Sequence, residues 1–219
     1  AVHDPFQKIK PSRASQVYFL GSQRIFKGGI ILLPDISKEI NEYLATLARS
    51  YPVHSLWASR IGDPCDRYLY HSVVDWQASA PLDARMYGIF ELGKHLEILG
   101  GKYLQATGWV VQQSPDGFLE KHISGKIDFF ISRDELRKIP VEIKWLSAGI
   151  EKSWKEMLYS DKRWIRRYPA QIMIYMYLRA SRYGLFLAFN KLNSKPSHIW
   201  IDFEDNEVIS YIEGLLQKA

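Results

Sequence analysis

Apolar residues are spaced along the chain in two ways, one typical of helices and the other of strands. Recurrence every three or four positions, with caps and prolines near the ends, predicts helices over residues 38–49, 64–74, 79–107, 153–160, 168–182 and 205–217. Short alternating or continuous apolar runs predict strands over residues 109–111, 123–132, 139–146, 185–190 and 198–203. The mostly polar run 133–138 is expected to join two of these strands as a hairpin loop. This order of elements indicates an α/β fold with a mixed central β-sheet flanked by helices.

The N-terminal part of the chain differs from the rest. Residues 1–35 carry scattered Pro, Gly, Ser and Lys, which is typical of an irregular arm. The helix that follows should end before Pro52, because the residue preceding a proline disfavours the helical region. We therefore expect residues 1–50 to form an N-terminal arm and helix, residues 51–219 to form the functional domain, and the whole to be a single globular domain.

The composition is that of a globular protein, since 47% of the 219 residues are apolar and the length allows a buried core. A single cysteine, Cys65, excludes a disulfide framework, a four-cysteine zinc site and a cysteine-ligated iron–sulfur cluster within this chain. It also suits a reducing compartment, so a cytoplasmic location is expected. No apolar run approaches the roughly 18 residues that span a bilayer, and we expect no membrane partner. The net charge of +5 is only a mild excess and favours a polyanionic partner weakly.

Candidate chemistry lies on the first predicted strand pair. Successive strand residues point to opposite faces, so Glu142 and Lys144 should project together, while Val141 and Ile143 face the other way. If the two strands pair antiparallel, Asp128 falls beside Glu142. Two carboxylates placed so would bind magnesium, a hard cation that prefers oxygen ligands, and a nearby lysine could polarise water or offset phosphate charge. The alternative is an ordinary Glu/Lys pair on a solvated strand face.

These residues resemble a known family. Gly125-Lys-Ile-Asp128 followed by Glu142-Ile-Lys144 resembles the metal-binding hairpin of the PD-(D/E)XK nuclease superfamily, although Ile127 stands where the name-giving pattern has proline. That departure is common in the RecB-like exonuclease branch. The resemblance implies a restriction-endonuclease-like core and a metal-dependent nuclease, in which the main-chain carbonyl of Ile143 also ligates the metal.

Three further segments resemble the RecB-like branch, including CRISPR-associated RecB-like exonucleases. Gly93-Lys-His-Leu-Glu97 resembles its first-helix motif, and Gln171-Ile-Met-Ile-Tyr175 resembles its Gln-x-x-x-Tyr motif. Residues 59–70 resemble the N-terminal segment that carries the first cluster cysteine in many members. The other cysteines are absent here, so no iron–sulfur cluster is expected.

The helix that carries Glu97 holds other ionisable side chains. Glu97 is expected to reach the metal directly or through water; otherwise it is a surface glutamate paired with Lys94 or Lys102. Glu91 and His95 are rival ligands on the same helix.

Gln171 and Tyr175 lie four residues apart and therefore on one helix face. Their polar groups could bind a phosphate or orient Lys144. The alternative for Tyr175 is simple packing in the core.

A basic segment with interleaved tryptophans precedes these two residues. Trp154 and Trp164 lie among basic residues that can track phosphates while aromatic rings stack on unpaired bases, as in single-strand binding. A solvated helix with half-buried tryptophans explains the pattern equally well. Four residues of this segment are candidates for binding phosphate, and Arg67 of the short predicted helix 64–74 is a fifth. The four are Lys162, Arg163, Arg166 and Arg167.

The leading hypothesis is a metal-dependent DNA nuclease, favoured as an exonuclease of DNA repair or recombination. Asp128, Glu142, the Ile143 carbonyl and Glu97 would hold Mg²⁺, with Mn²⁺ expected to substitute, and Lys144 would orient the attacking water. Two alternatives stay open: a catalytically silent nucleic-acid-binding module, and a subunit of a larger recombination or CRISPR-adaptation complex. No P-loop is present, so helicase activity would need a partner. The sequence leaves oligomeric state, and RNA as substrate, undecided.

Overall fold

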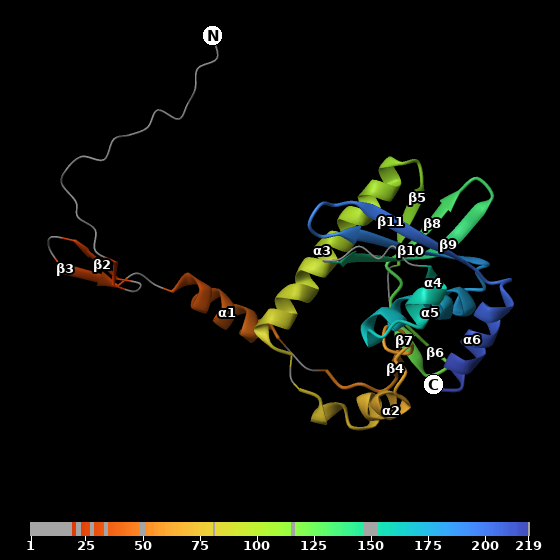
Figure 1. The fold of residues 1–219 in the computed structure, drawn as a ribbon, viewed down its shortest axis with the longest axis horizontal. Helices are drawn as coiled ribbons and strands as arrows, with labels where there is room; N and C mark the ends of the chain where they lie inside the picture. The colour runs from red at the N-terminus through yellow and green to blue at the C-terminus, as the bar shows by residue number, and fades with distance from the viewer. Residues whose placement is uncertain are drawn as a thin grey trace, which may run out of the picture. The chain divides into compact units, whose positions relative to one another are not determined.

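A computed structural model gives the fold (Figure 1). It describes the backbone of residues 19–20, 23–26 and 29–32, and residues 35–48, 51–80, 82–114, 117–146 and 153–218 with their side chains. The chain divides into two compact units, Ala1–Tyr43 and Leu44–Ala219. The expected division at residue 50, into an arm with its helix and a functional domain, stays a prediction.

The first unit contains a small sheet where an irregular arm was expected. Strands β1 (Phe19–Leu20), β2 (Gln23–Phe26) and β3 (Gly29–Leu32) pair antiparallel in that order. The expectation was wrong for these strands, because Ile and Phe, which favour strands, recur in the sequences of β2 and β3. Helix α1 (Ile36–Leu47) follows and begins two residues before the predicted start.

The second unit is built on a five-stranded sheet in the order β11-β10-β9-β8-β5. Strands β9 and β10 run parallel, while the other neighbouring pairs run antiparallel. The predicted α/β class with a mixed central sheet flanked by helices is therefore confirmed. Its strands are β5 (Val110–Gln113), β8 (Phe129–Arg133), β9 (Leu136–Leu146), β10 (Tyr183–Asn190) and β11 (Pro196–Asp202).

The single strand predicted over residues 123–132 is in fact two strands of two sheets. Strand β7 (Ile123–Gly125) belongs to a three-stranded sheet with β4 (Leu56–Trp57) and β6 (Phe118–Glu120), and β8 starts only at Phe129. A Cβ on Gly125 would lie 3.1 Å from Ala58 Cβ and from the Phe118 ring, so the chain passes this point without room for a side chain. The intervening residues 126–128 carry the chain from one sheet to the other. The predicted loop 133–138 is correspondingly short, because β9 begins at Leu136.

Helix boundaries differ from the prediction where capping and packing act. Asp83 caps α3 by accepting a hydrogen bond from Met86 N at 2.7 Å, so this helix starts later than residue 79. Pro64 lies outside α2, whose N-cap is Cys65. The helix expected from residue 168 begins at Arg163 and runs through Pro169, since its buried face packs on the core and outweighs the local cost of proline. The helices are α2 (Asp66–Val74), the 3₁₀ turn Trp76–Ala78, α3 (Ala84–Ala106), α4 (Trp154–Leu158), α5 (Arg163–Leu178) and α6 (Asn206–Leu216).

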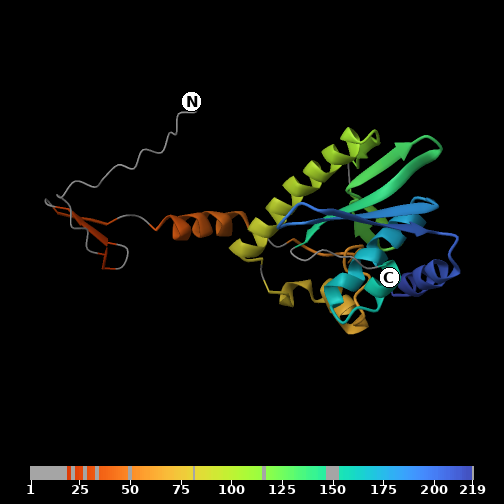
Figure 2. The same cartoon turned by 45° about the horizontal axis from the view of Figure 1, so that its top comes forward.

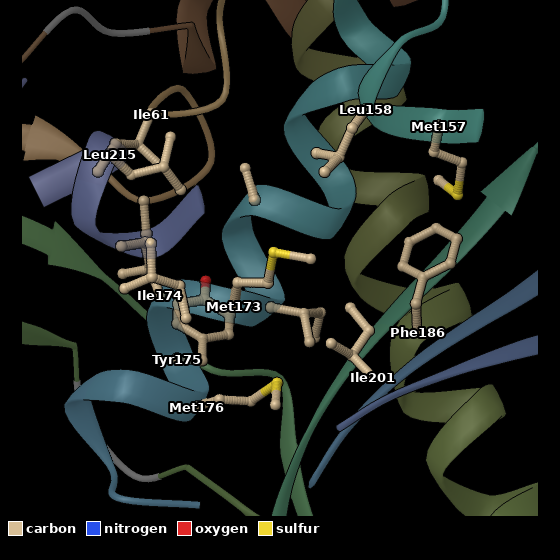
Figure 3. Close-up of a cluster of buried hydrophobic side chains, with 14 of the residues drawn as sticks. Ile61, Met157, Leu158, Met173, Ile174, Tyr175, Met176, Phe186, Ile201 and Leu215 are labelled. Atoms are coloured by element: carbon tan, nitrogen blue, oxygen red, sulfur yellow. The ribbon is translucent and has the colours of Figure 1, made fainter. Parts of the chain in front are cut away.

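The large sheet is covered on both faces (Figure 2). Helix α3 lies on one face, where Gly100 and Gly101 leave room for Ile143 and Phe129: a Cβ on either glycine would come within 3 Å of those side chains. The other face packs on α4, α5 and α6, and Met173 and Met176 of α5 lie in the buried cluster that Figure 3 shows. Among the described residues, none of the helices is both long and apolar enough to cross a membrane.

Candidate active site

The site forms where β8 stops pairing with β9. The last paired residues are Phe129 and Val141, so the following part of β9 has no β8 residue opposite it. The Asp128 side chain replaces the missing β8 acceptor, since its Oδ2 accepts a hydrogen bond from the main-chain N–H of Ile143 at 2.8 Å. The predicted antiparallel arrangement, with Asp128 beside Glu142, is confirmed.

Glu142 and Lys144 lie on the sheet face that α5 covers, whereas Val141 and Ile143 pack in the core of the opposite face, as the strand alternation predicted. Glu142 is buried, and its Oε1 lies 2.5 Å from Lys144 Nζ. The same ammonium lies 3.2 Å from the carbonyl oxygen of Ile143 and 3.5 Å from Glu97 Oε1. Three oxygens from three residues thus surround one positive charge.

Helix α3 offers three ionisable candidates, and the structure separates them. Glu97 reaches the site through its contact with Lys144, instead of pairing with a surface lysine of its own helix. Glu91 forms a surface ion pair with Lys94, at 2.6 Å between Oε1 and Nζ. The His95 side chain is exposed.

The position of α3 is set by a hydrogen bond next to Glu97. The indole Nε1–H of Trp145 donates to the main-chain carbonyl of Leu96 at 2.9 Å, and the Trp145 ring stacks on Phe189. Trp145 directly follows Lys144 in β9, so this bond ties the two partners of the ion pair together. Nothing in the sequence pattern singled Trp145 out.

Burial and mutual repulsion dominate the electrostatics. Burial, and then the charge of Asp128, raise the pKa of Glu142 to about 8. Burial also raises the pKa values of Asp128 and Glu97. Burial opposes the charge of Lys144, yet the surrounding carboxylates, Glu142 first, raise its pKa. The site therefore holds more carboxylates than its one lysine compensates.

Gln171 and Tyr175 are both buried, and their polar groups are used within the protein. Gln171 Nε2 donates to Glu142 Oε2 at 2.9 Å and to the Tyr175 hydroxyl at 2.7 Å. The Tyr175 hydroxyl in turn donates to the Lys126 carbonyl at 3.0 Å. This arrangement favours support of Glu142, and of the segment before Asp128, over the direct substrate contact that the sequence suggested.

Two of the five candidate phosphate-binding residues contact one buried carboxylate, and the other three do not. Arg163 and Arg167 form ion pairs with the buried Asp63, which sequence reasoning missed because the partners lie 100 and 104 residues away. These hydrogen bonds outweigh the effect of burial and lower the pKa of Asp63. The others lie elsewhere: Arg166 donates to the carbonyl of Ser160, Lys162 Nζ lies 6.0 Å from the Trp164 ring centroid, and Arg67 is exposed on α2.

Comparison with known proteins bears on the fold. No family model matches the chain, and no curated protein sequence matches it significantly. The crystal structure of SSO0001 is 14% identical, with a TM-score of 0.50 over 84% of this chain and 87% of that chain. The alkaline exonuclease LHK-Exo from Laribacter hongkongensis is 16% identical, with a TM-score of 0.49 over 80% of this chain and 89% of that chain. At these identities the similarity to SSO0001 concerns the fold alone.

The donor chemistry can be tested against a divalent cation. Within the residues that the structure describes, no group of three or more His, Cys, Asp or Glu side chains could hold a metal ion. The donors gathered here are two carboxylates, Asp128 and Glu142, and the carbonyl of Ile143. This set fits Mg²⁺, which binds through one or two carboxylates and keeps several waters. Three oxygens already surround the positive Lys144 ammonium here, so the surroundings of this site favour a cation.

Proposed function

We propose that this chain is a metal-dependent nuclease that hydrolyses phosphodiester bonds of DNA, as an exonuclease with a RecB-like PD-(D/E)XK core. One observation carries the proposal: Glu142 and the Ile143 carbonyl, on a segment that resembles the nuclease hairpin, surround Lys144 Nζ beside Asp128, and Glu97 joins them from α3. A binding module has no need for a half-buried lysine beside a buried carboxylate, because burying charged groups costs folding free energy.

Each residue has a role in this proposal. Asp128, Glu142 and the Ile143 carbonyl would hold Mg²⁺, which supplies charge neutralisation at the phosphate and a more acidic water. Lys144 would orient the water that attacks phosphorus and stabilise the negative charge that develops on the phosphate. Glu97 would reach the same ion directly or through water, and its contact with Lys144 would hold that lysine in place from α3. Gln171 keeps the Glu142 carboxylate oriented through its hydrogen bond.

The setting of the reaction is part of the proposal. DNA repair or recombination would use such an activity, and a helicase partner would supply strand separation because no P-loop occurs in the sequence.

The test is cleavage of end-labelled linear single- and double-stranded DNA beside a covalently closed circle, with magnesium, manganese or EDTA. Loss of linear DNA with a divalent metal, while the circle is spared, is the expected result. Lys144→Ala and Asp128→Asn should each abolish cleavage with circular dichroism unchanged. Glu91→Gln, on the same helix as Glu97 but paired with Lys94 at the surface, is the matched control and should cleave normally.

Two results would contradict the proposal. Cleavage that persists in Lys144→Ala would remove the proposed site. Absence of cleavage with every metal, while DNA still binds, would favour a nucleic-acid-binding module. Cutting of the circle would keep the chemistry and change exonuclease to endonuclease.

A further inference from the structure

A second polar cluster lies on α5, away from the carboxylates and lysine. The side chain of Asp63 has 0% exposure, and each of its two oxygens faces one arginine of the helix. Arg163 Nη2 lies 2.5 Å from Oδ1, and Arg167 contacts Oδ2 through Nη2 at 2.5 Å and Nε at 3.2 Å. One carboxylate therefore holds two guanidinium groups in a defined arrangement.

Asp63 has little freedom to move away from these arginines. A Cβ on the preceding Gly62 would lie 2.5 Å from Ala170 Cβ and 2.8 Å from the Arg166 carbonyl oxygen, so this loop rests directly on α5. Asp63 Oδ1 also accepts a hydrogen bond from Cys65 N at 3.0 Å. The position of Asp63 is thus fixed by the packing of Gly62 before it and by the hydrogen bond from Cys65 N after it.

The arginines keep donors and exposure that Asp63 does not use. Each guanidinium has five N–H donors, of which Asp63 takes one from Arg163 and two from Arg167. The side chain of Arg163 is 51% exposed and that of Arg167 is 26% exposed. The Tyr68 ring centroid lies 5.4 and 5.3 Å from the two guanidinium carbons. The cluster has a net charge of +1 and presents it toward solvent.

The two arginines lie on the same helix, and on the same face of it, as a residue of the candidate active site. Arg163, Arg167 and Gln171 follow one another at intervals of four residues on α5, about 6 Å of helix each. Gln171 contacts Glu142. The two arginines therefore lie one and two intervals along the helix from the residue that supports the carboxylate.

Aromatic rings accompany the arginines along the helix. Trp164 and Tyr168 are also four residues apart, with ring centroids at 5.9 Å, and Tyr168 stacks on Phe186 at 5.3 Å. Phe186 is the β10 residue that pairs with Glu142. Trp164 is 44% exposed, which leaves its ring accessible to an unpaired base.

We propose that Asp63 is a positioning residue that holds Arg163 and Arg167 as one phosphate-binding site for a nucleic-acid strand entering the Asp128–Glu142–Lys144 site. The ligand chemistry is the phosphodiester backbone, which planar guanidinium groups recognise through paired N–H donors. The proposal rests on the proposed nuclease function, since it takes the same strand as the substrate of the neighbouring site.

The sign of one substitution separates positioning from bulk charge. Asp63→Asn removes a negative charge below a surface that would bind a polyanion, so bulk electrostatics alone predicts tighter binding of DNA. Positioning predicts the opposite, because the two guanidinium groups lose their common anchor. We expect Asp63→Asn to weaken binding of a fluorescent single-stranded oligonucleotide about tenfold, measured by anisotropy in EDTA, the size expected for losing one charged hydrogen-bonded contact.

Arg163→Gln tests the site from its exposed side, because this side chain is half exposed and Asp63 keeps its contacts with Arg167 and Cys65 N. It should lower the slope of log affinity against log salt by about one, since one phosphate contact is lost. A merely structural defect would leave that slope unchanged at temperatures below unfolding. The matched control is Arg182→Gln: Arg182 is 50% exposed and also ion-paired, with Asp202 and Glu204, and should leave affinity and slope unchanged.

The outcomes separate this inference from the proposed function. Unchanged or tighter binding by Asp63→Asn, or an Arg163→Gln salt slope equal to that of Arg182→Gln, overturns the inference even if cleavage is normal. Should Asp63→Asn fail to fold, the two arginine variants decide. Weaker binding by both Asp63→Asn and Arg163→Gln, in a protein that cuts no DNA with any metal, supports the phosphate site and refutes the nuclease.

Discussion

Tyr175→Phe tests whether α5 supports the candidate site through one hydroxyl group. The substitution removes the donor to the Lys126 carbonyl and the acceptor of the Gln171 amide, and keeps the ring. A hydrogen bond contributes about 0.5–1.5 kcal/mol net, and a buried group left without a partner costs about 1–3 kcal/mol. The bond to the Lys126 carbonyl is only partly buried, so water can replace this donor. Gln171 keeps its bond to Glu142. We therefore expect the free energy of unfolding to fall by about 1–2 kcal/mol.

Activity should fall as well, because the Tyr175 hydroxyl bonds to the segment that leads into Asp128. Misplacement of a reacting group by about 1 Å can cost about a hundredfold in rate, so we expect a loss of about ten- to a hundredfold in cleavage under magnesium. Urea unfolding gives the stability, and the slope m should be unchanged because the exposed surface is the same.

Tyr177→Phe is the control on the same helix, since its hydroxyl bonds to the exposed Lys121 side chain. It should change stability by less than about 0.5 kcal/mol and leave cleavage unchanged. Equal effects of Tyr175→Phe and Tyr177→Phe on stability and cleavage would refute the reasoning, because the buried bonds would then contribute nothing specific.

Two further predictions concern charge at the site. The folded-state pKa of Glu142, about 8 against an ordinary 4.5, means that the folded protein binds this proton more tightly than the unfolded chain. The stabilisation that comes from protonated Glu142 is complete below pH 4.5 and is lost as the pH rises through 8. The urea midpoint in EDTA should therefore decrease over that range, and Glu142→Gln should remove this part of the decrease; an identical profile in the variant would contradict it. Magnesium at a hundredfold excess over Kd should raise the free energy of unfolding of the wild type by about 2.7 kcal/mol, seen as a higher urea midpoint, and leave the midpoint of Asp128→Asn unchanged. A rise of equal size in both would place magnesium elsewhere.

The hairpin residues could be predicted from local rules, whereas the supporting residues could not. Strand alternation places Glu142 and Lys144 on one face regardless of what covers it. The choice among Glu91, His95 and Glu97 depends on where α3 lies on the sheet, and this is set by two glycines and by Trp145. Those contacts join positions far apart in sequence, so no pattern within the helix contains them.

The sequence by itself determined the α/β class and most of the helices and strands, because these follow from periodicity. It placed Asp128 beside Glu142 on the condition that their strands pair antiparallel, and the structure shows that pairing. Only the tertiary structure decided that residues 123–132 divide between two sheets, since Ile127 continues the apolar pattern through the crossing. It also decided that α5 begins at Arg163 despite Pro169, and that Asp63 is buried between two arginines. Local propensity amounts to fractions of a kcal/mol per residue, so burial of one helix face and compensation of a buried charge outweigh it.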